Sequence, residues 1–371
     1  MVFDDALLRE AAETARHAET KWPRDLAKGL RSDADLKEPR WGEILGPTKA
    51  RGDPNGVALH EGRVIARWGD PERADMTFSV TKSFLALLAG IALGDGLIRS
   101  LDDLAGDYAL DDGFESPHNR TITWRHLLEQ TSEWNGWLWG KPDQVDHHRA
   151  IGQAGTRSGD DGGAEKGEAR TLRTPGTFWE YNDVRVNRLS LSLMQVFRRP
   201  LPEVLRERVM TPIGASDTWV WHAYENARFE IDGVRMPSVP GGGHWGGGLF
   251  ISSEDLGRVG RLVQLGGVWE GRQVLPAGWA EQLRRPCALN PTYGLMWWLN
   301  TDQQYLPEAP ASSYFMVGAG SNIVWLDDVL GLVVVMRWIN RRQLGAIVEG
   351  FLGAAVGDDL PSSEGVASGG I

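Results

Sequence analysis

The apolar run at 84–93 constrains the fold of this chain more than any other stretch. Its sequence, FLALLAGIAL, contains no charged side chain. A membrane-spanning helix needs roughly 20 apolar residues, so this run is too short to cross a bilayer. It predicts a helix that is buried on most sides inside a protein core. Gly94 and Gly96 follow the run and are suitable residues to end that helix.

The composition is that of a globular protein with an acidic surface. The chain has 371 residues, enough to bury one large core or two subdomains, and its formal net charge is −11. That charge argues against nucleic acid and against an anionic membrane surface, because both partners need a basic face. For the oligomeric state, a monomer and a homodimer both stay open.

The N-terminus and the cysteine content indicate the compartment. The first twenty residues are acidic, with no basic start and no long apolar stretch, so they do not look like a secretory signal peptide. The chain has one cysteine, Cys287, which excludes an intramolecular disulfide and which we expect to be an inert thiol. These observations predict a cytoplasmic protein.

Hydrophobic periodicity and turn residues predict the order of the elements. Helices are expected at 6–18, 84–93, 122–130, 184–197 and 343–352. Strands are expected in a hairpin at 56–70 and at 293–300, 313–317, 322–326 and 331–338. The sequence DDVL joins the last two strands in a hairpin. Between these groups, 241–267 reads as a Gly-rich turn, a strand and a helix capped by Ser253.

Strands and a helix at each end of the chain, with helices and loops between them, predict an α+β fold. The antiparallel sheet is then assembled from both ends of the chain, and a mostly helical part is inserted. We expect one domain, 1–355, with its α/β part at about 1–100 and 241–355 and its helical part at about 101–240. The polar tail, 356–371, is predicted to be disordered. The Gly-rich stretch 151–176 predicts a long mobile or functional loop.

Ser79 and Lys82 stand three residues apart, directly before the apolar run. On the first turn of a helix they share one face, which places an amine close to a hydroxyl. A serine hydroxyl needs a base to become a nucleophile, and burial would lower the pKa of Lys82 and make it a usable base. The alternative is that Ser79 caps the helix and Lys82 is solvated, and the motif alone does not exclude it.

Other catalytic and metal-binding patterns are missing. The chain has neither the G-x-S-x-G nucleophile elbow nor an H-E-x-x-H zinc motif. The stretch 141–150, KPDQVDHHRA, holds two His and two Asp, but its spacing fits no common metal site, so we expect a solvated loop. The sequence therefore predicts no metal and no cofactor.

Five segments in the same order carry a resemblance to a known family. They are FSVTKSF (78–84), TWRHLLEQTSEWNG (123–136), TPGTFWEYND (174–183), GGGHWGGGLFISSEDLGRVGRLV (241–263) and GAGSNIVWLDDVLGLVVVMRW (318–338). Together they resemble the serine β-lactamase-like superfamily, in its class C-type branch with family VIII carboxylesterases and 6-aminohexanoate-dimer hydrolases. The resemblance covers roughly 56–352. It implies a β-lactamase/penicillin-binding-protein-like fold, with an antiparallel sheet flanked by helices and a mostly helical subdomain.

The resemblance also implies roles for particular residues. Ser79 becomes the acylated nucleophile, with Lys82 as its partner. Tyr181 matches the tyrosine of the Y-x-N motif, which shares the general-base role and protonates the leaving group. The backbone N–H groups of Ser79 and Ala319 form the oxyanion hole, and Gly318 lets a substrate approach the strand closely.

Asp183 is a departure from the family pattern, which usually has Asn at this position. It has two readings, as the N-cap of the helix at 184–197 and as a partner of Lys82. If Asp183 faces Lys82, it keeps that lysine cationic and the base role moves towards Tyr181.

The third family motif, K-[ST]-G, is absent, because no lysine follows Lys166. Met316, Val317 and Gly318 stand in its place. Without a cation there to hold a substrate carboxylate, a neutral ester or amide is expected rather than a penicillin.

Aromatic residues in or beside the matched segments are predicted to wall the substrate pocket. The chain has 17 Trp residues, most of which we expect in the core. The predicted pocket residues are Trp134, Trp137, Trp179, His244 and Trp245. The sequence as a whole predicts a serine hydrolase that forms an acyl-enzyme on Ser79 with a small-molecule ester or amide. An acyltransferase with the same intermediate and a non-catalytic penicillin-binding-like module are the alternatives.

Overall fold

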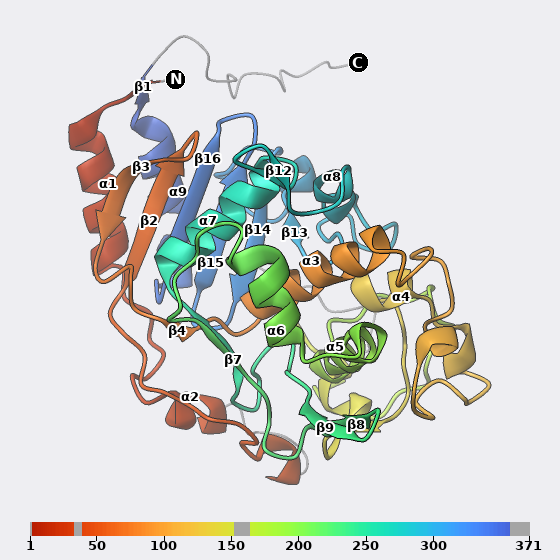
Figure 1. The fold of residues 1–371 in the computed structure, drawn as a ribbon. Helices are drawn as coiled ribbons and strands as arrows, with labels where there is room; N and C mark the ends of the chain where they lie inside the picture. The colour runs from red at the N-terminus through yellow and green to blue at the C-terminus, as the bar shows by residue number, and fades with distance from the viewer. Residues whose placement is uncertain (1, 33–38, 152–163, 357–371) are drawn as a thin grey trace, which may run out of the picture.

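A six-stranded antiparallel sheet lies at the centre of the α/β part (Figure 1). The computed structural model describes residues 2–32, 39–151 and 164–356. The strand order in the sheet is β13-β14-β15-β16-β2-β3. The strands are β2 (Asn55–His60), β3 (Arg63–Trp68), β13 (Trp298–Leu299), β14 (Tyr314–Gly318), β15 (Asn322–Asp327) and β16 (Leu332–Arg337). The sheet is assembled from both ends of the chain, as predicted, because β16 pairs with β2 from Leu332 opposite His60 to Arg337 opposite Asn55.

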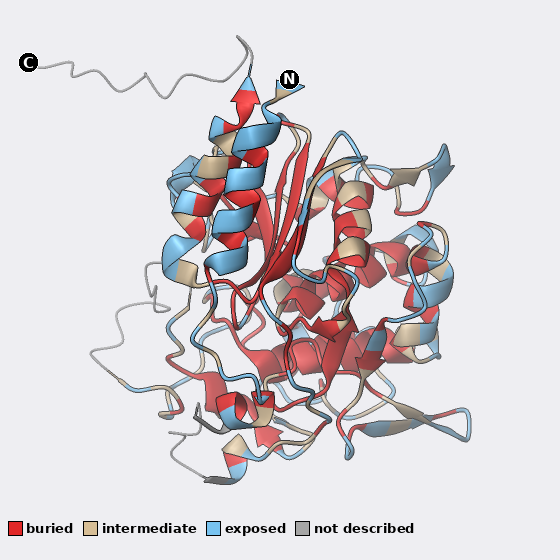
Figure 2. Ribbon diagram, turned by 90° about the vertical axis from the view of Figure 1, so that its left-hand side faces the viewer, coloured by how far each residue is buried: buried red, intermediate tan, exposed pale blue. Residues whose placement is uncertain are grey.

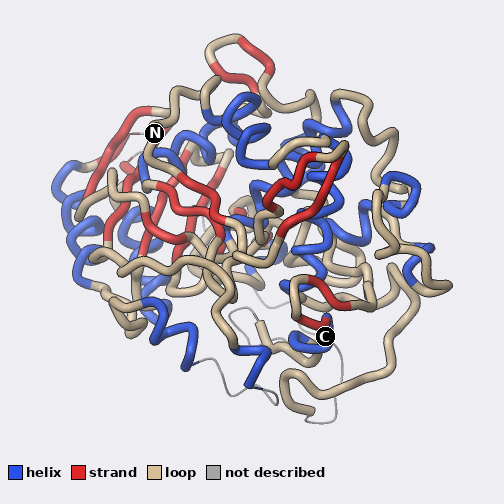
Figure 3. The backbone as a smooth tube through the Cα atoms, turned by 60° about the horizontal axis from the view of Figure 1, so that its bottom comes forward, coloured by secondary structure: helices blue, strands red, loops and turns tan. Residues whose placement is uncertain are grey.

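Alternating side chains on the central strands explain why both faces of the sheet are covered. Val333 and Val335 belong to one buried cluster, and Val334 and Met336 belong to another on the opposite face. Helices α1 (Asp5–His17) and α9 (Leu344–Gly353) pack against each other beside the second face. Helix α7 (Ser253–Gln264) packs on the first face. Figure 2 shows the strands buried between helices whose outer sides are exposed, and Figure 3 shows helices along the outer side of the sheet.

Helix α3 (Val80–Gly94) connects the sheet to the helical part. Every residue from Val80 to Ala92 is buried, as the apolar run predicts, and α3 contacts both β14 and α5 (Asp183–Phe197). The other helices of this part are α4 (Trp124–Leu128) and α6 (Leu201–Leu205). Within the described ranges, no helix combines the length and the apolar character needed to span a membrane.

Short elements complete the fold. Strand β10 (Gly248–Ile251) lies between β4 (Asp75–Met76) and β7 (Val220–His222), and β1 (Val2–Phe3) pairs with β17 (Ala355–Val356). The remaining elements are α2 (Leu26–Ser32), α8 (Trp279–Leu283), β5 (Trp137–Leu138), β6 (Lys141–Pro142), β8 (Arg228–Ile231), β9 (Val234–Pro237), β11 (Val268–Trp269) and β12 (Arg272–Gln273).

Three local predictions were wrong. The strand expected at 293–300 is reduced to β13, because the chain turns back on itself where the N–H of Gly294 donates to the carbonyl of Trp297 at 2.9 Å. Helix α7 is capped by Ser252 instead of Ser253, and α5 is capped by Asn182 instead of Asp183. Residues 152–163 of the expected loop and 357–371 of the expected tail lie outside the described residues.

Candidate active site

Ser79 stands at the start of α3, directly after a strained residue. Phe78 has a φ of 50°, which is unfavourable for a bulky side chain, and its buried ring packs against Trp22 and Trp338 with ring centroids 5.2 and 6.2 Å apart. This packing holds the turn that presents Ser79. The Ser79 side chain makes no capping hydrogen bond, so the alternative in which it only caps the helix does not hold.

Lys82 lies beside Ser79 and is buried. Its Nζ donates to Ser79 Oγ at 2.9 Å, and only 1% of its side chain is exposed. The same Nζ contacts Asp183 Oδ1 and lies 4.7 Å from the centre of the Tyr181 ring. The neighbouring Gly242 leaves room for this amine, since a Cβ there would lie 2.6 Å from Nζ. Lys82 is therefore not the solvated lysine of the alternative interpretation.

The charge state of Lys82 differs from the simplest expectation. Burial by itself lowers the pKa of Lys82, but the charge and hydrogen bond of Asp183, together with Tyr181, outweigh this effect and raise the pKa above its usual value. For Asp183, burial opposes ionisation, but the charges of Lys82 and Arg149 hold its pKa well below the usual range. The pair is therefore ionised at neutral pH, and Lys82 is an ammonium in the resting site.

Arg149 is a member of this site that the sequence interpretation missed. Its Nη1 donates to Asp183 Oδ2 at 2.6 Å and lies 3.3 Å from Asp146 Oδ2. Asp146 is buried, and its Oδ1 lies 3.1 Å from Lys166 Nζ. The prediction of a solvated loop at 141–150 was therefore wrong. The sequence did contain a sign of buried ion pairs, because Asp143 and Asp146 precede the His pair and Arg149 follows it.

A second buried ion network connects the segments that surround residues 141–150. Arg170 Nη1 donates to Glu133 Oε2 at 2.7 Å, and Arg170 Nη2 donates to Glu180 Oε2 at 2.7 Å. From α5, Arg185 Nη1 donates to Glu133 Oε1 at 2.7 Å, and its Nη2 reaches Asp143 Oδ2 at 3.2 Å. These contacts tie α5 to the segments on either side of the candidate site.

A cavity of about 140 Å³ is bordered by two of the three predicted catalytic residues, Ser79 and Tyr181, but not by Lys82. Ser79, Tyr181, Gly318 and Ala319 all border it, so the structure brings these four together. Gly318 at the end of β14 lies against the segment before α3, because a Cβ there would be 2.0 Å from the carbonyl oxygen of Thr77. This close approach sets Ala319 beside Ser79.

Tyr181 is held through its ring. Its side chain is buried, and its ring stacks on Trp298 with centroids 5.8 Å apart and an interplanar angle of 25°. Arg149 lies on this ring as well, with Cζ 5.2 Å from its centre. The tyrosine ring therefore lies close to two cations, Lys82 and Arg149.

The other residues that border the cavity were not predicted as pocket residues. They are Arg149, Ile151, Trp298, Tyr305, Val317 and Arg341. Arg341 Nη2 donates to the Tyr305 hydroxyl at 3.3 Å, and no carboxylate pairs with Arg341 among the described residues. Residues 316–319 contain no cation. The sequence did not reveal that Arg341, which precedes α9, brings a cation to the same cavity.

None of the five residues predicted to wall the pocket borders this cavity. Trp134 and Trp245 are buried, and Trp137 is 66% exposed on β5. Trp179 packs behind Tyr181, with ring centroids 6.4 Å apart. His244 lies behind Asp183, with Nδ1 3.8 Å from Oδ2, and burial lowers its pKa to about 3, so it is neutral. Position beside a matched segment did not reveal which way a side chain points.

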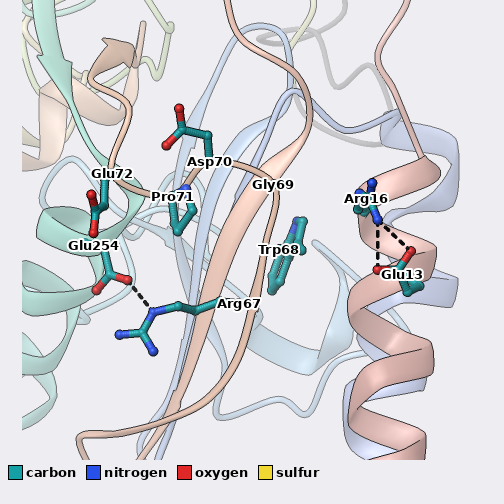
Figure 4. Close-up of a pocket in the computed structure, with 9 residues that line it drawn as sticks. All are labelled: Glu13, Arg16, Arg67, Trp68, Gly69, Asp70, Pro71, Glu72 and Glu254. Atoms are coloured by element: carbon teal, nitrogen blue, oxygen red, sulfur yellow. Dashed lines mark hydrogen bonds and ion pairs between the residues drawn. The ribbon is translucent and has the colours of Figure 1, made fainter.

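A larger hollow elsewhere carries no comparable chemistry. It encloses about 630 Å³ at the free edge of the sheet, next to β3 (Figure 4). Its charges are paired in part, since Arg67 Nε donates to Glu254 Oε1 at 2.7 Å and Arg16 lies 3.2 Å from Glu13. No serine, cysteine, tyrosine or lysine is among its lining residues, all of which the structure describes. The smaller cavity at Ser79 is the candidate active site.

Nothing in the described part of the chain groups three or more His, Cys, Asp or Glu side chains in a way that could hold a metal ion.

Comparisons with known proteins identify the family. The sequence model of the beta-lactamase family matches residues 57–346, and no curated protein matches the chain. EstCE1, a hydrolase with promiscuous acyltransferase activity, is 16% identical with a TM-score of 0.56, over 94% of this chain and 98% of that chain. A D-stereospecific amidohydrolase from Streptomyces sp. is 17% identical with a TM-score of 0.56, over 93% and 99%. A penicillin-binding protein homologue from Caulobacter crescentus is 14% identical with a TM-score of 0.56, over 89% and 96%. The predicted fold class is thereby confirmed, and the chain belongs to the beta-lactamase family.

Proposed function

We propose that the protein is a serine hydrolase that forms a covalent acyl-enzyme on Ser79 and hydrolyses a carboxylic ester or a small amide. One observation carries the proposal: Lys82 Nζ lies 2.9 Å from Ser79 Oγ beside a cavity that Tyr181 and Ala319 also border. A nucleophile, groups that can move a proton and candidate oxyanion donors are the parts that acyl transfer needs.

In the proposed reaction, Ser79 Oγ attacks the substrate carbonyl carbon, and the Oγ–C bond forms as the carbonyl oxygen becomes an oxyanion. The N–H groups of Ser79 and Ala319 donate to that oxyanion. The proton that Ser79 loses passes to the leaving alcohol or amine as its bond to carbon breaks. Water then attacks the ester on Ser79, which releases the acid and returns a proton to Ser79.

The charges of the site divide the proton-transfer roles. Because Asp183 raises the pKa of Lys82, the lysine is an ammonium that holds Ser79 Oγ and stabilises negative charge next to it. Tyr181, whose ring lies 4.7 Å from Lys82 Nζ, then carries the proton between Ser79 and the leaving group. This assignment extends the expectation that Asp183 shifts the base role towards Tyr181.

The size of the cavity favours a short acyl group, since about 140 Å³ is small for a ligand site. Two similar structures have activities of the proposed kind. EstCE1 is described as a hydrolase with acyltransferase activity, and the Streptomyces protein as an amidohydrolase. An acyltransferase that uses the same acyl-enzyme is the second candidate, and the description of EstCE1 is the observation that favours it.

The test is a substrate panel with the wild-type protein and Ser79→Ala. The panel contains p-nitrophenyl esters of increasing chain length, nitrocefin and an amino-acid amide. We expect turnover of short esters by the wild type, little turnover of nitrocefin, and no turnover above background by Ser79→Ala. Equal turnover by both proteins contradicts the proposal. An added alcohol that receives most of the acyl groups indicates the acyltransferase, and a stable adduct without turnover indicates the non-catalytic module.

A further inference from the structure

Asp183 divides its two carboxylate oxygens between two cations. Oδ1 accepts from Lys82 Nζ, and Oδ2 accepts from Arg149 Nη1 at 2.6 Å. Both partners are poorly accessible to solvent, with side chains 1% and 17% exposed. The backbone N–H of Asp183 donates to Asp146 Oδ2 at 2.7 Å, so the carboxylate is fixed at the start of α5. Both carboxylate oxygens of Asp183 therefore contact cations, and its backbone is held in place by Asp146.

The net charge of this group follows from its members. Lys82, Asp183 and Arg149 together carry one positive charge, and the neighbouring pair of Asp146 and Lys166 is neutral. Without Arg149, the carboxylate of Asp183 would cancel the ammonium of Lys82. With Arg149, one unit of positive charge is left beside Ser79 and Tyr181. A neutral side chain at position 183 would give the same net charge without any arginine.

We propose that Arg149 is a positioning residue of this site: its guanidinium neutralises Asp183, so that Asp183 can hold Lys82 beside Ser79 without cancelling the positive charge of the ammonium. The inference rests on the proposed function of Ser79. Its consequence is electrostatic. The remaining positive charge stabilises the negative charge that forms when Ser79 or Tyr181 gives up its proton during the reaction. Arg149 then acts on the reaction through Asp183 and Lys82.

The other charged groups around the cavity do not supply this charge. His244 is neutral, because burial lowers its pKa to about 3. Lys166 pairs with Asp146, and Arg341 lies at the Tyr305 hydroxyl on another wall of the cavity. For Arg149 itself, the charges of Asp183 and Asp146 outweigh burial and raise its pKa, so it stays a cation at every working pH. Arg149 is therefore the cation that balances Asp183.

The test is the pH dependence of kcat/KM for a short p-nitrophenyl ester. Arg149→Met removes a positive charge next to Tyr181, the proposed base. We therefore expect the acidic limb of the profile to move up by about one pH unit. At pH values below that limb, kcat/KM of Arg149→Met is then expected to be about tenfold lower than that of the wild type. Arg149→Lys keeps the charge and is expected to leave the limb in place. The double variant Arg149→Met, Asp183→Asn restores the net charge and is expected to move the limb back towards its wild-type position.

A matched control separates this effect from a general loss of packing. Arg188→Met removes another buried arginine, one that pairs with Asp111 at 2.8 Å and does not border the cavity. We expect it to lower the melting temperature without moving the pH profile. An unmoved limb in Arg149→Met, or a double variant with the same limb as that single variant, overturns the inference. An increase in KM alone also overturns it, since that result makes Arg149 a substrate contact.

The outcome can be told apart from a failure of the proposed function. If Ser79 is not the nucleophile, wild-type and Ser79→Ala proteins turn over the ester equally, and no profile can be assigned to this site. If only the inference fails, hydrolysis depends on Ser79 but its pH profile does not respond to Arg149. Circular dichroism of each variant at the assay temperature shows whether a lost activity reflects a lost fold.

Discussion

Tyr181 is positioned by the contacts of its ring, and it borders the cavity at Ser79. The ring stacks on Trp298 and lies beside Lys82 and Arg149. Tyr181→Phe removes the hydroxyl and keeps these packing contacts. We therefore expect kcat for a short ester to fall roughly 10²- to 10⁴-fold, the range of a lost acid–base group, with the melting temperature almost unchanged. Activity near the wild-type level in this variant would remove Tyr181 from the proton path.

Arg341 gives the cavity a cation that has no carboxylate partner among the described residues. A charged hydrogen bond to a substrate carboxylate contributes about 1.5–3 kcal/mol. We therefore expect Arg341→Met to raise KM at least about tenfold for an ester that bears a free carboxylate. Its effect on the matching neutral methyl ester is expected to be small. Equal changes for both substrates would show that Arg341 supports the cavity wall without recognising charge.

At the scale of elements, the candidate site depends on the contact between the end of β14 and the segment before α3. Gly318 makes this contact possible, because any Cβ there would lie 2.0 Å from the carbonyl oxygen of Thr77. Gly318→Ala is expected to separate the two segments and to cost about 1–3 kcal/mol in the free energy of unfolding, as overpacking does. Chemical denaturation measures the loss, and hydrolysis of a short ester should fall with it.

Gly353→Ala is the matched control for this contact. Gly353 lies at the end of α9 with nothing within 4 Å of the added Cβ. Alanine favours a helix over glycine, so this variant should be as stable as the wild type or slightly more stable. If Gly318→Ala behaves like Gly353→Ala, the contact between β14 and the start of α3 does not hold the site together.

The sequence predicted most elements because the periodicity of their apolar residues matches the face that the structure buries. The run that became α3 is an example, since residues apolar on every side can only be buried. The hairpin of β15 and β16 is another, because its turn residues stand between two strongly β-forming runs. The helix caps, Ser252 and Asn182, each lie one residue before the predicted cap. Neighbouring polar side chains can each accept hydrogen bonds from the same backbone N–H groups, so the sequence does not separate them.

The candidate site was predictable only where local spacing or a family motif marks the residues, as for Ser79, Lys82 and Tyr181. Ser79 and Lys82 share one helical turn, so their contact follows from spacing alone. Arg149 comes from a loop and Arg341 from a short 3-10 helix, both far from position 79 in the sequence, and only the tertiary fold brings them to the cavity. The buried charges at 141–150 were misread because hydrophilic sequence indicates a solvated loop unless its ion partners are known.

At the scale of the whole molecule, a buried ion network links stability to pH. For Glu133, burial opposes ionisation, but the hydrogen bond from Arg170 and the charge of Arg185 outweigh it and lower the pKa from 4.5 to about 2. A carboxyl whose pKa is lowered by folding stabilises the fold above its unfolded pKa. That contribution is lost as the pH falls from about 4.5 towards 2.

We expect this one group to account for about 2 kcal/mol of lost stability between pH 6 and pH 3. Urea denaturation of wild type and Glu133→Gln at both pH values measures it. The variant lacks the titrating carboxylate, so the stability difference between the two proteins should shrink by that amount at pH 3. A difference that is the same at both pH values would show that Glu133 does not keep its lowered pKa in the folded protein.

The most direct test of the central claim is covalent labelling of Ser79 by a fluorophosphonate probe. After incubation at neutral pH, the intact mass of the wild-type protein should increase by one probe adduct, and peptide mass spectrometry should place that adduct on Ser79. Ser79→Ala should show neither the adduct nor ester hydrolysis while it keeps its circular dichroism spectrum. A probe adduct on another residue, or hydrolysis that persists in Ser79→Ala, would contradict the account.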